Sequence, residues 1–134
     1  MNLLQDLLRN AEKTERGIDM AVNSRRKGAE GERELAHELS KWGYKTRRGQ
    51  QFSGANGDAD VVGIPGLHIE CKRVEQLNLE KALDQSEHDA RIGEYAVVMH
   101  RRNRERWKVT MSLEQFMALW KKWEKINDKA RTTE

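Results

Sequence analysis

Two carboxylates and a lysine lie in the middle of the chain, where nine residues separate Asp60 from the run Glu70-Cys71-Lys72. Between them, the segment 64–66 (Ile-Pro-Gly) predicts a tight turn, because proline sets its first φ and glycine accepts a positive φ. The segments on either side, 59–63 and 67–72, therefore predict two paired strands. Carboxylate oxygens beside a lysine suit a hard divalent cation and an activated water.

Alternation along the second strand separates a core face from a polar face. Leu67, Ile69 and Cys71 point to one side, whereas Glu70 and Lys72 point to the other. The alternative is a surface salt bridge, since Glu-x-Lys is an ordinary pattern in a chain with 35% charged residues. The opposite face of this strand is apolar, and the tight turn brings Asp60 close to the polar face. Both features favour a metal site.

A third acid lies on a predicted helix over residues 27–42, which Gly43 is expected to end. The buried stripe of this helix is predicted to contain Leu35, Ala36, Leu39 and Trp42. One turn before this stripe lies Glu32, which is costly to bury without a metal or a basic partner. Its place in the first turn, where the helix dipole favours acids, is an equally simple explanation. Position alone leaves both open.

Further elements follow from local patterns. Apolar residues at helical spacing predict a helix over 2–15, ended by Gly17, with a connector over 18–24. A short basic strand is expected over 44–48 and a glycine-rich loop over 49–57. Asn78 caps a helix over 79–91, and 95–99 and 107–111 form a hairpin around a basic turn. Ser112 opens a last helix in which the following residues are expected to lie in the core or at a dimer interface: Leu113, Phe116, Met117, Trp120 and Trp123.

Composition narrows the class of protein. The chain has 134 residues, a net charge of +3 and one cysteine. This length suits one domain, and a single cysteine excludes an internal disulfide and favours a reducing compartment. Basic clusters favour a partner with phosphates, although a solvated basic surface would look the same. No apolar run is long enough to span a bilayer, so a cytoplasmic protein is expected, in the host cytosol if it is virus-encoded.

The segment 26–35, Arg-Lys-Gly-Ala-Glu-Gly-Glu-Arg-Glu-Leu, resembles the first-helix motif of archaeal-type Holliday-junction resolvases, including forms found in viruses. Asp60 followed by two valines and the run 70–72 resemble the remaining motifs of this group, which belongs to the PD-(D/E)XK nuclease superfamily. The resemblance implies an α/β, restriction-endonuclease-like core: a helix, a three-stranded meander, a second helix and further strands in a mixed sheet. Residues 25–111 would form this core, with a helical extension over 1–24 and a C-terminal helix and tail over 112–134.

The resemblance also implies roles for residues. Asp60, Glu70 and the backbone carbonyl of Cys71 would bind Mg²⁺, or Mn²⁺ as a substitute, and Glu32 would contribute directly or through water. Lys72 would orient the attacking water and stabilise the negative charge that develops on the phosphate. Asp58 is the alternative to Asp60. Candidate DNA contacts, drawn from the motifs, the basic clusters and the glycine-rich loop, are Arg33, Arg47, Arg48, Ser53 and Arg73.

The implied function is a metal-dependent endonuclease that cuts four-way DNA junctions as a homodimer. A repair or restriction-type nuclease of the same fold, acting on duplex, flap or single-stranded DNA, is the nearest alternative. A DNA-binding module without catalysis is the alternative from another class, because a fold does not guarantee activity. The added helices at both ends and the glycine-rich loop depart from a minimal resolvase, which leaves substrate preference and dimer geometry open.

Overall fold

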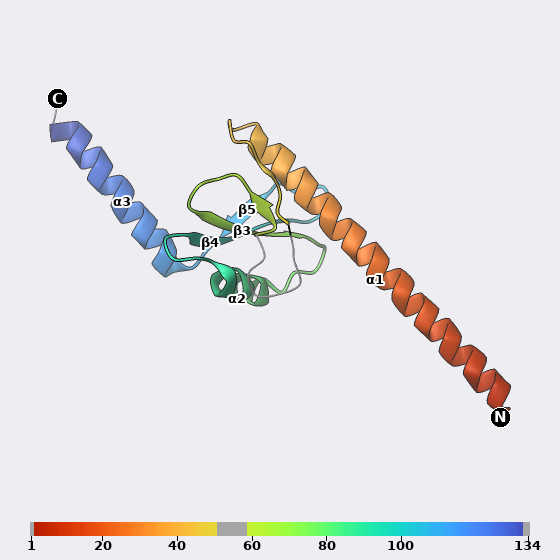
Figure 1. Cartoon of the computed structure of the whole chain (residues 1–134). Helices are drawn as coiled ribbons and strands as arrows, with labels where there is room; N and C mark the ends of the chain where they lie inside the picture. Colours follow the sequence, from red (N-terminus) through yellow and green to blue (C-terminus); the bar gives the residue numbers. More distant parts are fainter. Residues whose placement is uncertain (1, 51–58, 133–134) are drawn as a thin grey trace.

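The computed structural model describes residues 2–50 and 59–132 and contains three helices and five strands within them (Figure 1). In chain order the elements are α1 (Leu3–Ser40), β1 (Arg47–Arg48), β2 (Val61–Val62), β3 (Leu67–Arg73), α2 (Leu79–Asp89), β4 (Tyr95–Arg101), β5 (Lys108–Thr110) and α3 (Leu113–Thr132). The predicted glycine-rich loop falls largely on residues 51–57, and Ser53 and Asp58 also lie outside the described residues.

The five strands form one mixed sheet in the order β1-β2-β3-β4-β5. β1, β2 and β3 are antiparallel neighbours, β3 and β4 run parallel, and β4 and β5 are antiparallel. The parallel pair requires a crossover, which α2 provides. The predicted fold class, with its three-stranded meander, crossover helix and return hairpin, is confirmed. No helix in the described part of the chain is both long and apolar enough to cross a membrane.

The core lies between the C-terminal half of α1 and one face of the sheet. Leu35 and Ala36 of α1 pack in one buried cluster with Ile69, Cys71 and Val97 of the central strands. This confirms the predicted core face of β3. The other face is covered by α2 (Figure 1), whose buried Ser86 donates its hydroxyl to the Val97 carbonyl at 3.0 Å, so that its polar atom is satisfied.

Helix α1 corrects the prediction of two helices joined by a connector. It is continuous from Leu3 to Ser40, and Gly17 lies in its interior. An interior glycine costs only about 1 kcal/mol relative to alanine, and no proline interrupts the segment, so nothing forces the helix to end. The predicted boundary between residues 24 and 25 therefore falls inside a helix. The N-terminal half extends away from the sheet (Figure 1).

The end of α1 changes the environment of Trp42. The helix stops at Ser40, and Gly43 adopts a left-handed φ of 95°. Trp42 consequently lies in the terminating turn and is 76% exposed, so its predicted burial is wrong. The predicted strand over 44–48 is reduced to Arg47 and Arg48, while the Thr46 hydroxyl donates to the Ala36 carbonyl and ties this segment to α1.

Helix α3 also differs from its prediction. It begins as expected, with the Gln115 N–H donating to the Ser112 hydroxyl at 3.1 Å. The side-chain Oε1 of Gln115 accepts from the Ala96 N–H at 2.7 Å, which fastens the start of α3 to β4. Beyond this point, α3 leaves the sheet and contains no buried residue over its whole described length (Figure 1). Its apolar side chains therefore do not join the core, and a role in a dimer interface stays a prediction.

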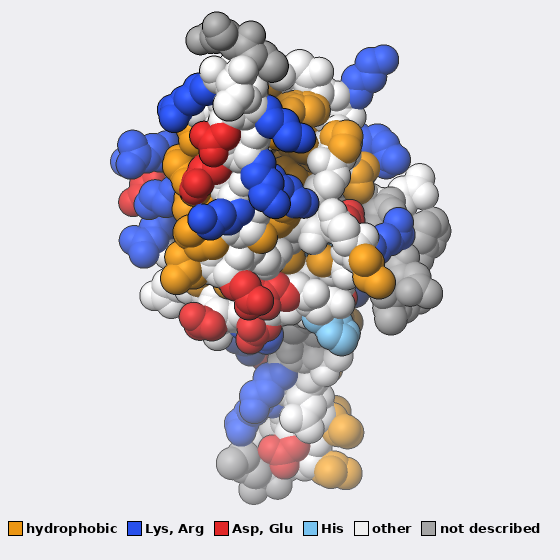
Figure 2. Space-filling model, turned by 90° about the vertical axis from the view of Figure 1, so that its left-hand side faces the viewer, with side chains coloured by type: hydrophobic (Ala, Val, Ile, Leu, Met, Phe, Trp, Pro, Cys, Tyr) orange, Lys and Arg blue, Asp and Glu red, His pale blue; other side chains and the backbone are white. Residues whose placement is uncertain are grey.

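Figure 2 faces the side of the molecule from which α3 extends and shows hydrophobic side chains at the surface among basic ones. Within α3, the rings of Phe116, Trp120 and Trp123 contact one another in sequence, with centroids 6.0 Å and 4.9 Å apart. These rings partly cover one another on the helix surface, which reduces but does not remove their exposure to water.

Candidate active site

The turn between β2 and β3 holds Asp60 against the middle of β3. The Asp60 N–H donates to the Ile69 carbonyl at 3.0 Å, and Val61 pairs with Ile69. Gly66 has a φ of 81°, as the predicted turn requires, and the Leu67 N–H donates to the Ile64 carbonyl at 3.3 Å. The tight turn thus sets the register of β2 against β3, and this register places Asp60 beside β3.

The Asp60 side chain is buried and serves as the hydrogen-bond acceptor for a backbone N–H of β3. Its Oδ2 accepts from the Cys71 N–H at 2.9 Å, one residue beyond Glu70. In a strand, the N–H and C=O of one residue point to the same side. The Cys71 carbonyl therefore faces the same side as Asp60. Burial beside these acids raises the pKa of the Cys71 thiol, so the side chain behaves as an apolar core group.

Glu70 and Lys72 lie on the opposite face of β3 from the core. Glu70 Oε1 is 3.6 Å from Lys72 Nζ, and the Glu70 side chain is 12% exposed. Burial, followed by the nearby charge of Asp60, raises the pKa of Glu70 to about 7, although Lys72 acts in the other direction. Two carboxylates thus share a small, poorly solvated space with one cation, an arrangement that a further positive charge would stabilise.

Glu32 approaches from α1. Its Oε2 accepts from Arg48 Nε at 2.7 Å, and its side chain is also 12% exposed. Burial raises the pKa of Glu32, the Arg48 hydrogen bond opposes this, and the charge of Asp60 raises it further. The structure therefore brings the four sequence-predicted side chains into one electrostatic neighbourhood. It also shows Arg48 as the partner of Glu32, a pairing across 16 residues that leaves no local signal in the sequence.

The donor set of Asp60, Glu70 and the Cys71 carbonyl consists of oxygens, which suit Mg²⁺ or Mn²⁺. No three acidic, histidine or cysteine side chains within residues 2–50 and 59–132 are close enough together to hold a metal ion. Two carboxylates and a carbonyl are nevertheless a chemically suitable partial shell for an ion that keeps several waters. Because Glu32 is engaged by Arg48, it fits a contribution through water better than direct contact.

The predicted DNA contacts divide into two groups. Arg33, Arg47 and Arg48 line one open concavity of about 500 Å³, together with His37 and Thr46. Arg33 and Arg47 are exposed there, whereas Arg48 is paired with Glu32. An open surface of this charge can accept phosphates without large rearrangement.

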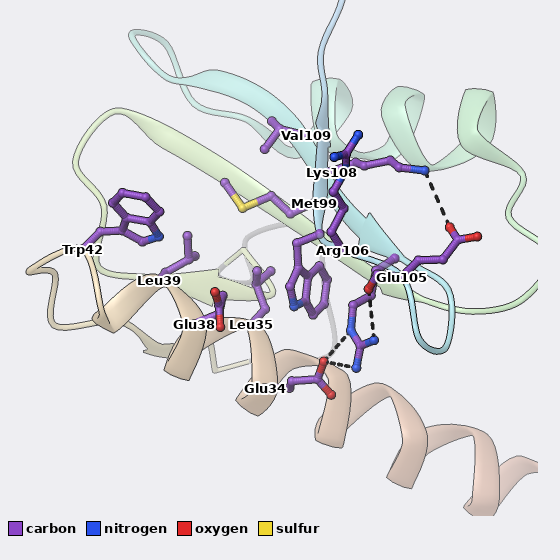
Figure 3. Close-up of a pocket in the computed structure, with 12 residues that line it drawn as sticks. Glu34, Leu35, Glu38, Leu39, Trp42, Met99, Glu105, Arg106, Lys108 and Val109 are labelled. Carbon is purple, nitrogen blue, oxygen red and sulfur yellow. Dashed lines mark hydrogen bonds and ion pairs between the residues drawn. The ribbon is translucent and has the colours of Figure 1, made fainter.

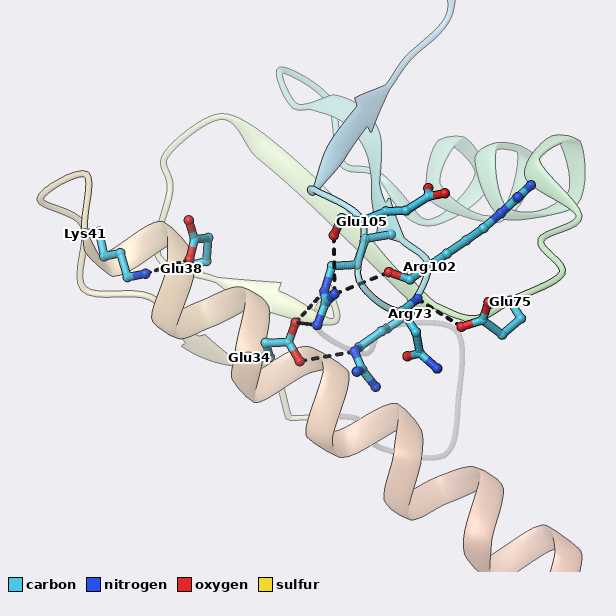
Figure 4. Close-up of polar contacts among 9 residues, drawn as sticks. Glu34, Glu38, Lys41, Arg73, Glu75, Arg102 and Glu105 are labelled. Atoms are coloured by element: carbon cyan, nitrogen blue, oxygen red, sulfur yellow. Dashed lines mark hydrogen bonds and ion pairs between the residues drawn. The ribbon is translucent and has the colours of Figure 1, made fainter.

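Arg73 belongs to the other group. Its Nε lies 3.1 Å from Glu34, which also forms an ion pair with Arg101 at the end of β4 (Figure 4). Arg101 in turn stacks over the Trp107 ring at 5.6 Å. These contacts join α1 to the ends of β3 and β4. The role of Glu34 could not be predicted from the sequence, because its partners Arg73 and Arg101 lie 39 and 67 residues away and leave no local signal.

A separate hollow of about 570 Å³ lies between α1 and the β4–β5 hairpin (Figure 3). Leu35, Leu39 and Met99 line its inner side, and Trp107 and Val109 come from the hairpin. None of the four sequence-predicted catalytic side chains lines this hollow. The four candidate side chains, from α1, β3 and the residue before β2, are therefore separate from this apolar hollow.

Comparisons with known proteins identify a family and solved structures that resemble the chain. The model of a family described as "Phage putative PDDEXK endonuclease" matches residues 23–134. The solved structure of Hjc, a Holliday junction resolvase from the archaeal hyperthermophile Archaeoglobus fulgidus, has 29% sequence identity and a TM-score of 0.49, covering 63% of this chain and 72% of that chain. No curated protein matches the chain.

Proposed function

The chain belongs to the phage PDDEXK endonuclease family, and on that premise we propose that it is an Mg²⁺-dependent, structure-selective DNA endonuclease that hydrolyses phosphodiester bonds in four-way junctions. The observation that carries the nuclease proposal is the convergence of Asp60, Glu70 and Lys72 across the β2–β3 turn. The preference for junctions is supported by the resemblance of segment 26–35 to the resolvase helix motif.

Asp60, Glu70 and the Cys71 carbonyl would hold the divalent ion, with Glu32 acting through water. When bound, the ion supplies positive charge to the scissile phosphate and lowers the pKa of the attacking water. Asp60 is held in place by the Cys71 N–H, so its carboxylate needs little reorganisation to bind a cation. The raised pKa of Glu70 reflects a carboxylate pair that gains stability from a cation.

Lys72 is proposed to orient the attacking water and to stabilise the negative charge that develops on the phosphate. Its Nζ lies 3.6 Å from Glu70 Oε1, and a lysine ammonium group carries three hydrogen-bond donors and no acceptor. A protonated lysine donates hydrogen bonds but cannot accept a proton. Electrostatic stabilisation therefore fits this contact better than a role as the general base.

Arg33 and Arg47 are proposed to position the DNA through its phosphates. Both are exposed and line the concavity next to Arg48, whose partner Glu32 belongs to the catalytic set. Contacts of this kind fix register and carry little sequence information. Two symmetric cuts across a junction need two active sites related by a twofold axis, so the enzyme is expected to act as a homodimer.

A cleavage assay tests this function directly. A four-way junction, a duplex of matched sequence and a flap DNA are incubated with the protein over a titration of Mg²⁺, with EDTA as the control. We expect metal-dependent cutting that is faster on the junction than on the duplex. Equal rates on all three DNAs would contradict junction selectivity. Absence of metal-dependent cutting on every DNA would contradict the nuclease proposal.

A further inference from the structure

A further concavity, with both polar and apolar lining, adjoins the candidate catalytic residues on the face of the sheet that α2 covers. It has a volume of about 300 Å³, and Glu70 and Lys72 form part of its wall. The rest of the wall comes from the connection after β3 and from one side of α2. Pockets for small ligands begin at about 300 Å³, so this one suits a single nucleoside rather than a longer segment.

The lining has two chemically different parts. Val74, Leu77 and Ala82 provide apolar surface, with Ala82 buried and Val74 at the rim. Amide side chains provide polar groups from Gln76 and Gln85. Aliphatic side chains with amides beside them can contact the face of a nucleobase and hydrogen-bond its edge, as proteins do with bases taken out of a duplex.

Two contacts hold the amides in place while leaving hydrogen-bonding capacity. Gln85 donates one N–H to Asp89 Oδ2 at 2.7 Å, and Asn78 Oδ1 accepts from the Lys81 N–H at 3.1 Å. A glutamine amide has a second N–H and a carbonyl, and an asparagine amide keeps two N–H donors. Lys81 also lines this concavity, so a positive charge lies within reach of a phosphate attached to the bound nucleoside.

We infer that this concavity, defined by Gln76, Asn78, Lys81 and Gln85, binds one unpaired nucleotide next to the scissile phosphate. The inference rests on the proposed function, since Glu70 and Lys72 mark where that phosphate would lie. A base inside continuous duplex cannot reach such a pocket without unstacking, which is least costly where the base is already unpaired. The pocket therefore selects DNA with an unstacked nucleotide at the cut, as found at branch points and flaps.

The test combines a change in the DNA with a change in the protein. Flap DNAs carry a single abasic nucleotide at successive positions around the cut that wild-type protein makes in the unmodified flap. At one position we expect kcat/KM for the wild-type protein to fall about tenfold, the effect of losing one base contact. In the double variant Gln76→Ala/Gln85→Ala, the same abasic substitution should have no additional effect.

Asp84→Ala is the matched control, because Asp84 is exposed on α2 and does not line this concavity. This variant should retain the wild-type response to the abasic nucleotide. Circular dichroism checks that each variant is folded. Equal abasic effects in the wild-type protein and the double variant would overturn the inference, as would cutting that is insensitive to an abasic nucleotide at every position.

A binding measurement separates failure of this inference from failure of the proposed function. A flap DNA carrying 2-aminopurine at its unpaired nucleotide is titrated with protein in the absence of metal. We expect a fluorescence change with the wild-type protein that is lost in Gln76→Ala/Gln85→Ala and retained in Asp84→Ala. That result without any Mg²⁺-dependent cutting would support the pocket and contradict the nuclease. Cutting without a variant-dependent fluorescence change would contradict the pocket alone.

Discussion

The β2–β3 region and the two projecting helical segments use similar residue patterns with different outcomes. Around β3, alternate apolar residues are buried and the polar ones are paired or packed beside one another. Along α3, the apolar side chains at helical spacing are 41–75% exposed, and the leucines near the start of α1 are exposed to a similar degree. Periodicity therefore shows which face of an element needs a partner, whereas proximity in the fold decides whether a partner is available.

The difference has a simple geometric origin. β3 is central, with a neighbouring strand on each side and a helix over each face, so both of its faces have neighbours. The N-terminal half of α1 and most of α3 extend beyond the sheet (Figure 1). A second copy in the proposed homodimer is one way to cover them.

Asp60→Ala should reduce kcat/KM for DNA cleavage about 10³-fold or more, because loss of a metal ligand removes several kcal/mol of transition-state stabilisation. Binding to the four-way junction should change little. Asp60 also accepts the Cys71 N–H, so Asp60→Asn serves as a variant that keeps the shape of the residue. Cleavage and gel-shift assays on both variants provide the measurement. Cleavage by Asp60→Asn at the wild-type rate would contradict the assigned metal site.

Truncating a core residue and an exposed apolar residue should have very different effects on stability. Leu35 is 1% exposed, so Leu35→Ala should cost about 2–5 kcal/mol in free energy of unfolding. Leu7→Ala, in the projecting half of α1, should cost about 0.5 kcal/mol or less in the monomer. Urea unfolding at low protein concentration measures both. A large, concentration-dependent loss for Leu7→Ala would show that the projecting stripe is covered by a second copy.

Mg²⁺ should bind about tenfold more weakly at pH 6 than at pH 8, because Glu70 must release a proton whose pKa is about 7. The sign follows from the raised pKa: the folded, metal-free protein holds this proton more tightly than the unfolded chain. Its stability therefore decreases as pH rises from about 4.5 toward 7.

Calorimetric titration of Mg²⁺ at several pH values measures this dependence. Glu70→Gln should remove most of the binding, whereas Glu114→Gln at the exposed start of α3 should leave the pH dependence unchanged. Affinity that is constant from pH 6 to pH 8 in the wild-type protein would argue against Glu70 as a ligand.

Gly17→Ala should stabilise the projecting half of α1 by up to about 1 kcal/mol, because nothing lies within 4 Å of an added Cβ and the glycine is helical. Gly43→Ala is the matched control: its added Cβ also meets empty space, but its φ of 95° penalises a side chain. Amide hydrogen exchange should slow around Gly17 in the first variant, and stability should fall in the second. Faster exchange around Gly17 would contradict a continuous α1.

Local chemistry made part of the site predictable. The turn at residues 64–66, the alternation along β3 and the caps at Asn78 and Ser112 depend on neighbouring residues, and the structure contains each of them. Relations between distant residues were not predictable in this way. The Arg48 bond to Glu32 and the two arginines at Glu34 arise only when β1, β3 and β4 meet α1.

The sequence by itself determined the order of the elements after α1, the strand face that carries Glu70 and Lys72, and the turn that returns Asp60 to them, because each depends on torsional preference or short-range spacing. Tertiary structure decided how buried these acids are, which arginine holds Glu32, and which apolar stripes have a neighbour. Burial and charge pairing are set by atoms far apart in the chain. They decided that β3 is enclosed, whereas α3 and the first half of α1 present apolar faces to solvent.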